Sequence, residues 1–257
     1  MVKPPNVNSI AEELRRAGDR ATTRTQAEKK NYAESLSRAL AARLAQTLRG
    51  TFPEILPAAD GSGQESKARA AKGLKKLDIN YSTVQLGLGL GVSIKTINFR
   101  DAATRRYTKN YTRADGELRA EASDYHERQP YAVLIAVVFL PSDACDDGGK
   151  TAPSSFGQAV QIFRFRAGRR KPSDTSMLFE RVFIGLYETD ERRFGEVAFF
   201  DVMNAPPKRG RPSALMTFEE LVQAIVSTYD ERNKPSFQWA EGETELVTLP
   251  EPDDADE

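Results

Sequence analysis

The sequence is poor in the residue types that build disulfide frameworks and sites for soft metals. Of its 257 residues, one is a cysteine, Cys145, and one is a histidine, His126. A single thiol excludes an internal disulfide framework, and these two side chains are too few for a structural zinc site. Any metal ion bound by this chain is therefore expected to have oxygen ligands.

Long hydrophobic runs are also missing. No apolar stretch approaches the roughly 20 residues that a transmembrane helix needs, and the first residues lack the basic and then apolar pattern of a secretory signal. We therefore expect a cytoplasmic protein with no membrane partner. Hydrophobic residues make up 39% of the chain, which is enough for a sizeable core.

The chain has no excess of either charge, since 37 Lys and Arg balance 37 Asp and Glu. The charges are nevertheless unevenly distributed, because basic residues concentrate in the first 120 residues and residues 251–257 form an acidic end. Lys75 and Lys76 in this basic half are candidate DNA contacts. The alternative is that these side chains only solvate the surface of helices.

The order of elements predicts an α/β, mixed α+β fold. Leucines recur every four positions from residue 36 to residue 48, which indicates a helix within residues 8–49. The run over residues 131–140 is apolar and β-branched and follows a helical segment, so it should be a strand inside the sheet, parallel to a neighbour. The other elements expected are strands over 75–82 and 92–97 with a glycine-rich turn at 87–91, helices over 114–128, 155–165 and 218–229, and a hairpin of 179–187 with 195–202.

Three segments follow from this pattern. We expect an N-terminal helical extension over residues 1–30 and an α/β domain over residues 31–240. Residues 241–257 are acidic and interrupted by proline, which is typical of a disordered tail.

Two charged residues stand out on the adjacent strands expected at 75–82 and 92–97. Asp78 lies on the first strand and Lys95 on the second, and strand alternation places Ser93 on the same face as Lys95. A carboxylate can hold a divalent cation that activates water, and a lysine can offset the negative charge that develops during phosphodiester hydrolysis. The alternative is a cross-strand ion pair with no catalytic role, worth at most about 1 kcal/mol.

Over roughly residues 30–140 this arrangement resembles the PD-(D/E)xK nuclease superfamily, which includes many restriction endonucleases. In that superfamily a helix with an acidic residue precedes a strand with a metal-binding aspartate, and the next strand carries an acid two positions before a lysine. The resemblance implies a restriction-endonuclease-like central mixed sheet flanked by helices, with Asp78 as the aspartate and Lys95 as the lysine. It also implies Mg²⁺ or Mn²⁺ as the cofactor. Ser93 stands where the superfamily usually has an acid.

The other metal ligands implied by the resemblance are Glu34 or Glu65 as the helix-borne acid, with both left open, and the backbone carbonyl of Ile94. Because Ser93 is neutral, one ligand must come from elsewhere or be absent. We therefore expect a metal-dependent DNA endonuclease of restriction or phage-defence type, acting as a homodimer or as a subunit of a multi-protein complex. The alternative is a catalytically inactive nuclease-like subunit that binds DNA or a partner protein.

A second basic motif is Lys208-Arg209-Gly210-Arg211-Pro212. It resembles the core of the AT-hook, in which arginines enter the narrow minor groove of A·T-rich DNA. Lys208, Arg209 and Arg211 are therefore further candidate DNA contacts, and a basic loop without a particular function is the alternative.

Three polar residues of the helix expected over 114–128 belong to neither the nuclease-like arrangement nor the AT-hook-like motif. Glu121 and Asp124 are expected to be solvated surface charges. His126, at the helix end and without a nucleophile nearby in the sequence, is expected to be structural.

Overall fold

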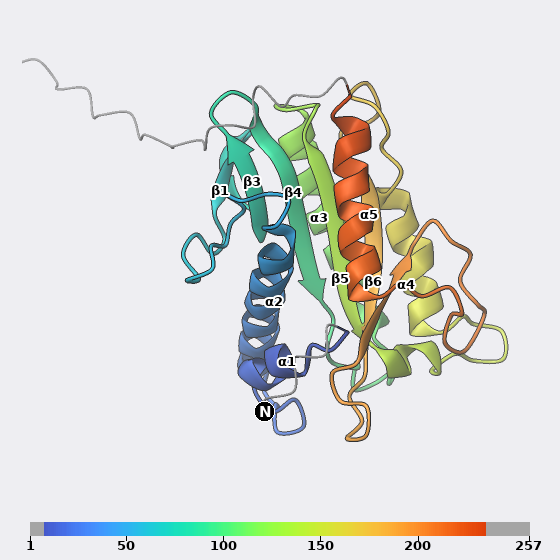
Figure 1. Cartoon of the computed structure of the whole chain (residues 1–257). Helices are drawn as coiled ribbons and strands as arrows, with labels where there is room; N and C mark the ends of the chain where they lie inside the picture. The colour runs from blue at the N-terminus through green and yellow to red at the C-terminus, as the bar shows by residue number, and fades with distance from the viewer. Residues whose placement is uncertain (1–7, 235–257) are drawn as a thin grey trace, which may run out of the picture.

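Five strands form one mixed sheet in the computed structural model, which describes residues 8–234 (Figure 1). In spatial order they are β3 (Ile79–Thr83), β4 (Gly87–Thr96), β5 (Val133–Pro141), β6 (Arg181–Tyr187) and β7 (Val197–Asp201). The three central strands β4, β5 and β6 are parallel, and each outer strand is antiparallel to its neighbour. A separate antiparallel hairpin consists of β1 (Lys67–Ala70) and β2 (Gly73–Lys76).

Helices cover both faces of the sheet (Figure 1). One face carries α1 (Ala11–Ala17), α2 (Gln26–Leu48) and α5 (Phe218–Arg232), and the other carries α3 (Tyr111–His126) and α4 (Ser155–Phe163). Short 3₁₀ turns are η1 (Thr108–Asn110), η2 (Ser142–Cys145) and η3 (Arg164–Arg166). The expected mixed sheet flanked by helices is therefore confirmed, and its likeness to restriction endonucleases stays a prediction.

Strand β5 is the centre of both hydrophobic cores and is buried along its whole length. Its alternate residues point to opposite faces, so that Ile135 and Val137 pack under α2 and α5 whereas Leu134 and Ala136 pack under α3 and α4. The expectation of a parallel strand inside the sheet is confirmed. The helices expected over 114–128, 155–165 and 218–229 and the hairpin of β6 with β7 are also present.

The helix expected within residues 8–49 is in fact two helices. The first ends at Gly18, whose φ of 109° lies in the region that favours glycine. The second begins with a capping box, in which the side chain of Thr25 accepts from the backbone of Glu28 and the Glu28 carboxylate accepts in return. The boundary expected at residues 30 and 31 falls inside α2. The tail expected over 241–257 lies outside the described residues.

The single strand expected over 75–82 is wrong, because Leu77 and Asp78 separate β2 from β3. The glycine-rich turn expected at 87–91 is also wrong, since these residues begin β4. A Cβ on Gly91 would lie 2.8 Å from the Leu134 side chain, so this glycine allows close packing within the sheet rather than a turn. None of the helices in the described part of the chain combines the length and the apolar content needed to cross a bilayer.

Candidate active site

Asp78 lies at the break between β2 and β3, beside the unpaired edge of β4. Pairing of β3 with β4 stops at Ile79 and Val92, so the backbone groups of β4 beyond Val92 have no partner strand on that side. The carboxylate oxygen Oδ2 of Asp78 fills this place by accepting a hydrogen bond of 2.6 Å from the Ile94 N–H. The carbonyl of Ile94 projects from the same edge of the strand, where the Ser37 hydroxyl donates to it at 3.4 Å. A carboxylate and a backbone carbonyl therefore meet at one point of the sheet.

Lys95 and Ser93 project from β4 toward α3, as strand alternation predicts. Lys95 Nζ lies 3.3 Å from Oε2 of Glu121 and 3.9 Å from Oε2 of Glu117. The Ser93 hydroxyl donates to the same Oε2 of Glu121 at 2.9 Å. A glutamate from α3 therefore occupies the position next to Ser93 where the resemblance led us to expect an acid on the strand.

The expectation that Glu121 is a solvated surface charge is wrong, because its side chain is only 16% exposed. The sequence does contain a signal for its position. Glu121 follows the buried Leu118 by three residues and precedes the buried Tyr125 by four, which places all three on one helix face. Asp124 is buried too and pairs with Lys72 and Lys75.

The charges at this site are electrostatically coupled. Burial raises the pKa of Asp78 from 3.8 to about 6, and the nearby Glu121 and Glu65 carboxylates act in the same direction, against the Ile94 N–H and Lys95. Burial alone would lower the pKa of Lys95, but Glu121, Asp78 and Glu117 outweigh it and raise that pKa above 10.5. Lys95 is therefore positively charged at neutral pH. The pKa of Asp78, about 6, lies only slightly below neutral pH.

The oxygen atoms around β4 are of the kind that binds a hard divalent cation. Asp78, Glu121 and the Ile94 carbonyl are oxygen donors, and Mg²⁺ typically needs only one or two carboxylates besides water and substrate phosphate. Within residues 8–234 no group of three or more His, Cys, Asp or Glu side chains is able to hold a metal ion. A cation at β4 would therefore need water and substrate oxygens in addition to the protein ligands. The buried hydroxyl of Tyr125 has no hydrogen-bond partner. Burial raises its pKa, and the charges of Glu121, Asp124 and Asp78 act in the same direction. An orphaned hydroxyl in such surroundings is a group that a bound water or hydrated cation would satisfy.

Glu34 and Glu65 lie on either side of this centre. Glu34 lines a small hollow of about 210 Å³ together with Ile94, Lys95 and other residues, and it pairs with Lys30 at 3.7 Å. Glu65 pairs with Lys76 at 2.7 Å and with Arg38 at 3.6 Å, and it acts on Asp78 through its charge. The choice between the two acids therefore stays open.

The residues proposed as DNA contacts fall into two separate groups. Lys75 and Lys76 lie on the β1–β2 hairpin, at the β3 edge of the sheet, and pair with Asp124 and Glu65. Lys208, Arg209 and Arg211 lie in the loop between β7 and α5, and this loop contacts the segments that follow β5 and β6.

The loop with the AT-hook-like motif is folded against the body of the protein. Arg211 pairs with the buried Glu188, and the Arg209 side chain donates to the Gly149 carbonyl. The N–H of Gly210 donates to the Cys145 carbonyl at 3.0 Å. Contact of this loop with DNA stays a prediction.

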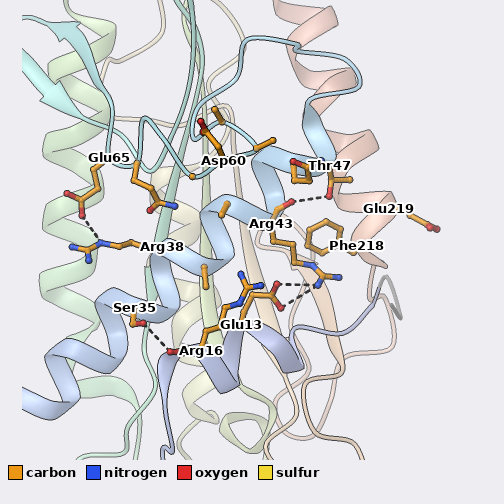
Figure 2. A pocket seen from close by; sticks show the side chains of 17 residues that line it. Glu13, Arg16, Ser35, Arg38, Arg43, Thr47, Asp60, Glu65, Phe218 and Glu219 are labelled. Atoms are coloured by element: carbon orange, nitrogen blue, oxygen red, sulfur yellow. Dashed lines mark hydrogen bonds and ion pairs between the residues drawn. The ribbon is translucent and has the colours of Figure 1, made fainter. Parts of the chain in front are cut away.

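A hollow of about 1440 Å³ lies elsewhere, on the outer side of α2 (Figure 2). Its charged side chains largely neutralise one another: Arg43 pairs with Glu13 at 3.4 Å, and Arg38 pairs with Glu65. Neither Asp78 nor Lys95 lines it. This hollow is therefore separate from the candidate site around β4.

Comparisons of the chain with protein-family models, with curated proteins and with solved structures found no match. The geometry around β4 is therefore the observation from which we infer a function.

Proposed function

We propose that this chain is a metal-dependent DNA endonuclease of restriction or phage-defence type. The observation that carries the proposal is the convergence of Asp78, Lys95 and Glu121 on one short segment of β4. Such a centre has the two elements that phosphodiester hydrolysis requires, namely carboxylates for a divalent cation and a cation for the developing negative charge.

The electrostatics favour this proposal over a purely structural ion pair. A structural pair needs one lysine and one carboxylate, whereas here burial raises the pKa of Asp78 and a second carboxylate, Glu121, acts in the same direction. Two partly buried carboxylates that repel each other destabilise the fold, and a bound cation would remove that repulsion.

Each side chain has a role in the proposed reaction. Mg²⁺ or Mn²⁺, held by Asp78, Glu121 and the Ile94 carbonyl, would neutralise the phosphate and lower the pKa of a water molecule. Lys95 keeps its charge at all pH values of interest and stabilises the attacking oxygen and the charge that develops on the phosphate. Ser93 holds Glu121 over the strand by donating to its Oε2. The neutral residue at this position thus orients an acid from α3.

The proposal includes a DNA substrate, a cytoplasmic location, and a homodimer or multi-protein complex. A second copy of the centre is the simplest way to cut both strands of a duplex, because one centre hydrolyses one phosphodiester at a time.

The alternative function is an inactive nuclease-like subunit that binds DNA or a protein. The observation in its favour is that Glu121 accepts from both Ser93 and Lys95, so these three groups already satisfy one another. An ion pair of this kind needs no metal to be stable.

A cleavage assay separates the two functions. Supercoiled plasmid is incubated with the protein and Mg²⁺, Mn²⁺ or EDTA, and Lys95→Ala is compared with a control, Lys171→Ala, at an exposed position before β6. We expect nicked or linear product only with metal, a loss of at least about 100-fold for Lys95→Ala, and unchanged cleavage by the control. Equal cleavage by Lys95→Ala would contradict the proposal, and no cleavage by any preparation would favour the inactive subunit.

A further inference from the structure

Three hollows join along the carboxyl end of β4. The first contains Lys95 and is the hollow of about 210 Å³ described above. It shares Glu34 and Arg113 with a second hollow of about 670 Å³. The second shares Lys29, Phe99 and Arg100 with a third, of about 710 Å³, under the connection between α1 and α2. We call this continuous depression the β4 groove.

The β4 groove is positively charged, although the whole chain has no net charge. Nine basic side chains line it: Arg15, Arg20, Arg24, Lys29, Lys30, Lys95, Arg100, Lys109 and Arg113. Four acidic side chains line it: Asp19, Glu34, Asp101 and Glu117. The hollow on the outer side of α2 has three basic residues against four acidic ones. The positive charge is therefore a property of the depression that opens onto Lys95.

Three of these cations are available to an anionic ligand. Among residues 8–234, Arg15, Arg24 and Lys29 make no ion pair, and the first two are exposed. Arg15 lies 5.6 Å above the ring of Phe194, and Lys29 lies 5.6 Å above the ring of Phe99. A ring face attracts a cation without neutralising its charge, so these contacts position the cations and leave them able to bind phosphate.

The distance from these cations to the candidate active site suits a polymer. Lys29 and Ser37 lie on α2, eight residues and therefore about 12 Å apart along the axis, and Ser37 donates to the Ile94 carbonyl. Phosphates of one DNA strand recur every 3.4 Å along the helix axis, so Lys29 lies roughly three or four phosphates from that carbonyl.

We propose that the β4 groove is the path of a nucleic-acid strand, with Arg15, Arg24 and Lys29 in contact with its phosphates upstream or downstream of the scissile bond. The identity of the polymer rests on the proposed function. The groove adds a surface at the carboxyl end of β4, lined by residues of both α2 and α3, and it is distinct from the β1–β2 hairpin and from the loop after β7.

The test measures binding without cleavage, by fluorescence anisotropy of labelled single-stranded and duplex DNA in EDTA over a range of salt concentrations. The groove variant is Arg15→Ala/Arg24→Ala/Lys29→Ala. Arg20 is kept because it donates to the Asn98 carbonyl and to the Tyr107 hydroxyl and so supports the fold.

The control is Arg128→Ala/Arg170→Ala/Lys171→Ala, which removes the same charge from exposed positions. Arg128 precedes β5, and Arg170 and Lys171 follow Arg169, whose side chain donates to the Pro130 carbonyl. All three therefore lie near the amino end of β5, roughly 30 Å from its carboxyl end at about 3.3 Å per residue.

We expect the groove variant to bind DNA at least tenfold more weakly at about 0.1 M salt. Each phosphate contact releases about 0.7 to 0.9 counterions when the DNA binds. Because the variant lacks three such contacts, its slope of log affinity against log salt should be smaller in magnitude by about 2 to 3. The control should bind like the unmodified protein. Equal weakening in both variants, an unchanged slope, or equal competition by polyglutamate of matched charge would overturn the assignment.

The result is separable from the proposed function. If the protein cleaves plasmid and the groove variant has an unchanged salt slope, the β4 groove is not the DNA path, whereas the proposed endonuclease function stands. If the groove variant has a reduced salt slope but the unmodified protein cleaves no DNA, the β4 groove is supported as a DNA path and the endonuclease function is contradicted.

Discussion

Replacing Asp78 by Asn should abolish DNA cleavage and at the same time stabilise the fold. The folded protein raises the pKa of this carboxyl from 3.8 to about 6, so the folded state holds the proton more tightly than the unfolded state. Ionisation of this carboxyl therefore destabilises the fold increasingly as the pH rises from about 4 to about 6, and the full effect is present above about pH 6. Asn has no charge and keeps an oxygen that can accept from the Ile94 N–H.

The magnitude follows from the two pKa values. At 1.36 kcal/mol per pKa unit, the rise from 3.8 to about 6 corresponds to roughly 2 to 3 kcal/mol of unfolding free energy at pH 8. For a domain of this size that is a rise in melting temperature of roughly 5 to 10 °C. The difference between the two proteins should shrink as the pH falls from about 6 toward 4 and nearly vanish below about pH 4, where Asp78 is protonated in both the folded and the unfolded state.

The assay is thermal and urea unfolding in EDTA at pH 8, 6 and 4, because a bound cation would stabilise the unmodified protein and hide the effect. A control with the opposite sign is Asp101→Asn. Backbone hydrogen bonding from Thr104 and the Lys109 side chain lower the pKa of Asp101 to about 2, so its charge stabilises the fold above about pH 4 and Asn should be destabilising there. If Asp78→Asn were less stable than the unmodified protein at pH 8, the reasoning about this carboxylate would be refuted.

Two further predictions concern activity and the core. The rate of cleavage should fall as the pH drops through about 6, because the Asp78 carboxylate must lose its proton to hold a cation; a rate profile that is flat from pH 5 to 8 would contradict this role. Glu180→Ala should destabilise the protein by about 3 to 5 kcal/mol in urea unfolding, because it leaves the buried Arg169 and Arg232 guanidinium groups without their shared carboxylate. A loss below about 1 kcal/mol would show that this buried cluster contributes little to stability.

Local patterns were sufficient for the central strands of the fold. The uninterrupted apolar run of β5 predicts a strand buried on both faces, and the structure has it between two parallel neighbours. Strand alternation likewise predicts that Ser93 and Lys95 share a face, as they do. Composition misled the prediction at Gly91, where a glycine serves close packing against Leu134, a contact 43 residues away in the sequence.

The part of the candidate site that local patterns missed comes from another element. Whether Glu121 or Glu117 lies over Ser93 depends on the rotation and the axial position of α3 on the sheet. The residues of β4 and its neighbours in the sequence do not determine that rotation or position. The helix pattern limits the choice, because Glu121 shares a face with Leu118 and Tyr125, but it does not say which strand that face covers. The partner of Ser93 is 28 residues distant, and tertiary packing alone brings the two together.

The most direct test of the central claim is the single-turnover rate of DNA cleavage by Glu121→Gln with saturating Mg²⁺ or Mn²⁺. The matched control is Glu127→Gln, at an exposed glutamate just after the same helix. If Glu121 provides the second carboxylate of a hydrolytic centre, Glu121→Gln should lose about 100-fold or more in rate whereas Glu127→Gln keeps the rate of the unmodified protein. Cleavage by Glu121→Gln at the unmodified rate would contradict the claim that Asp78, Lys95 and Glu121 act together.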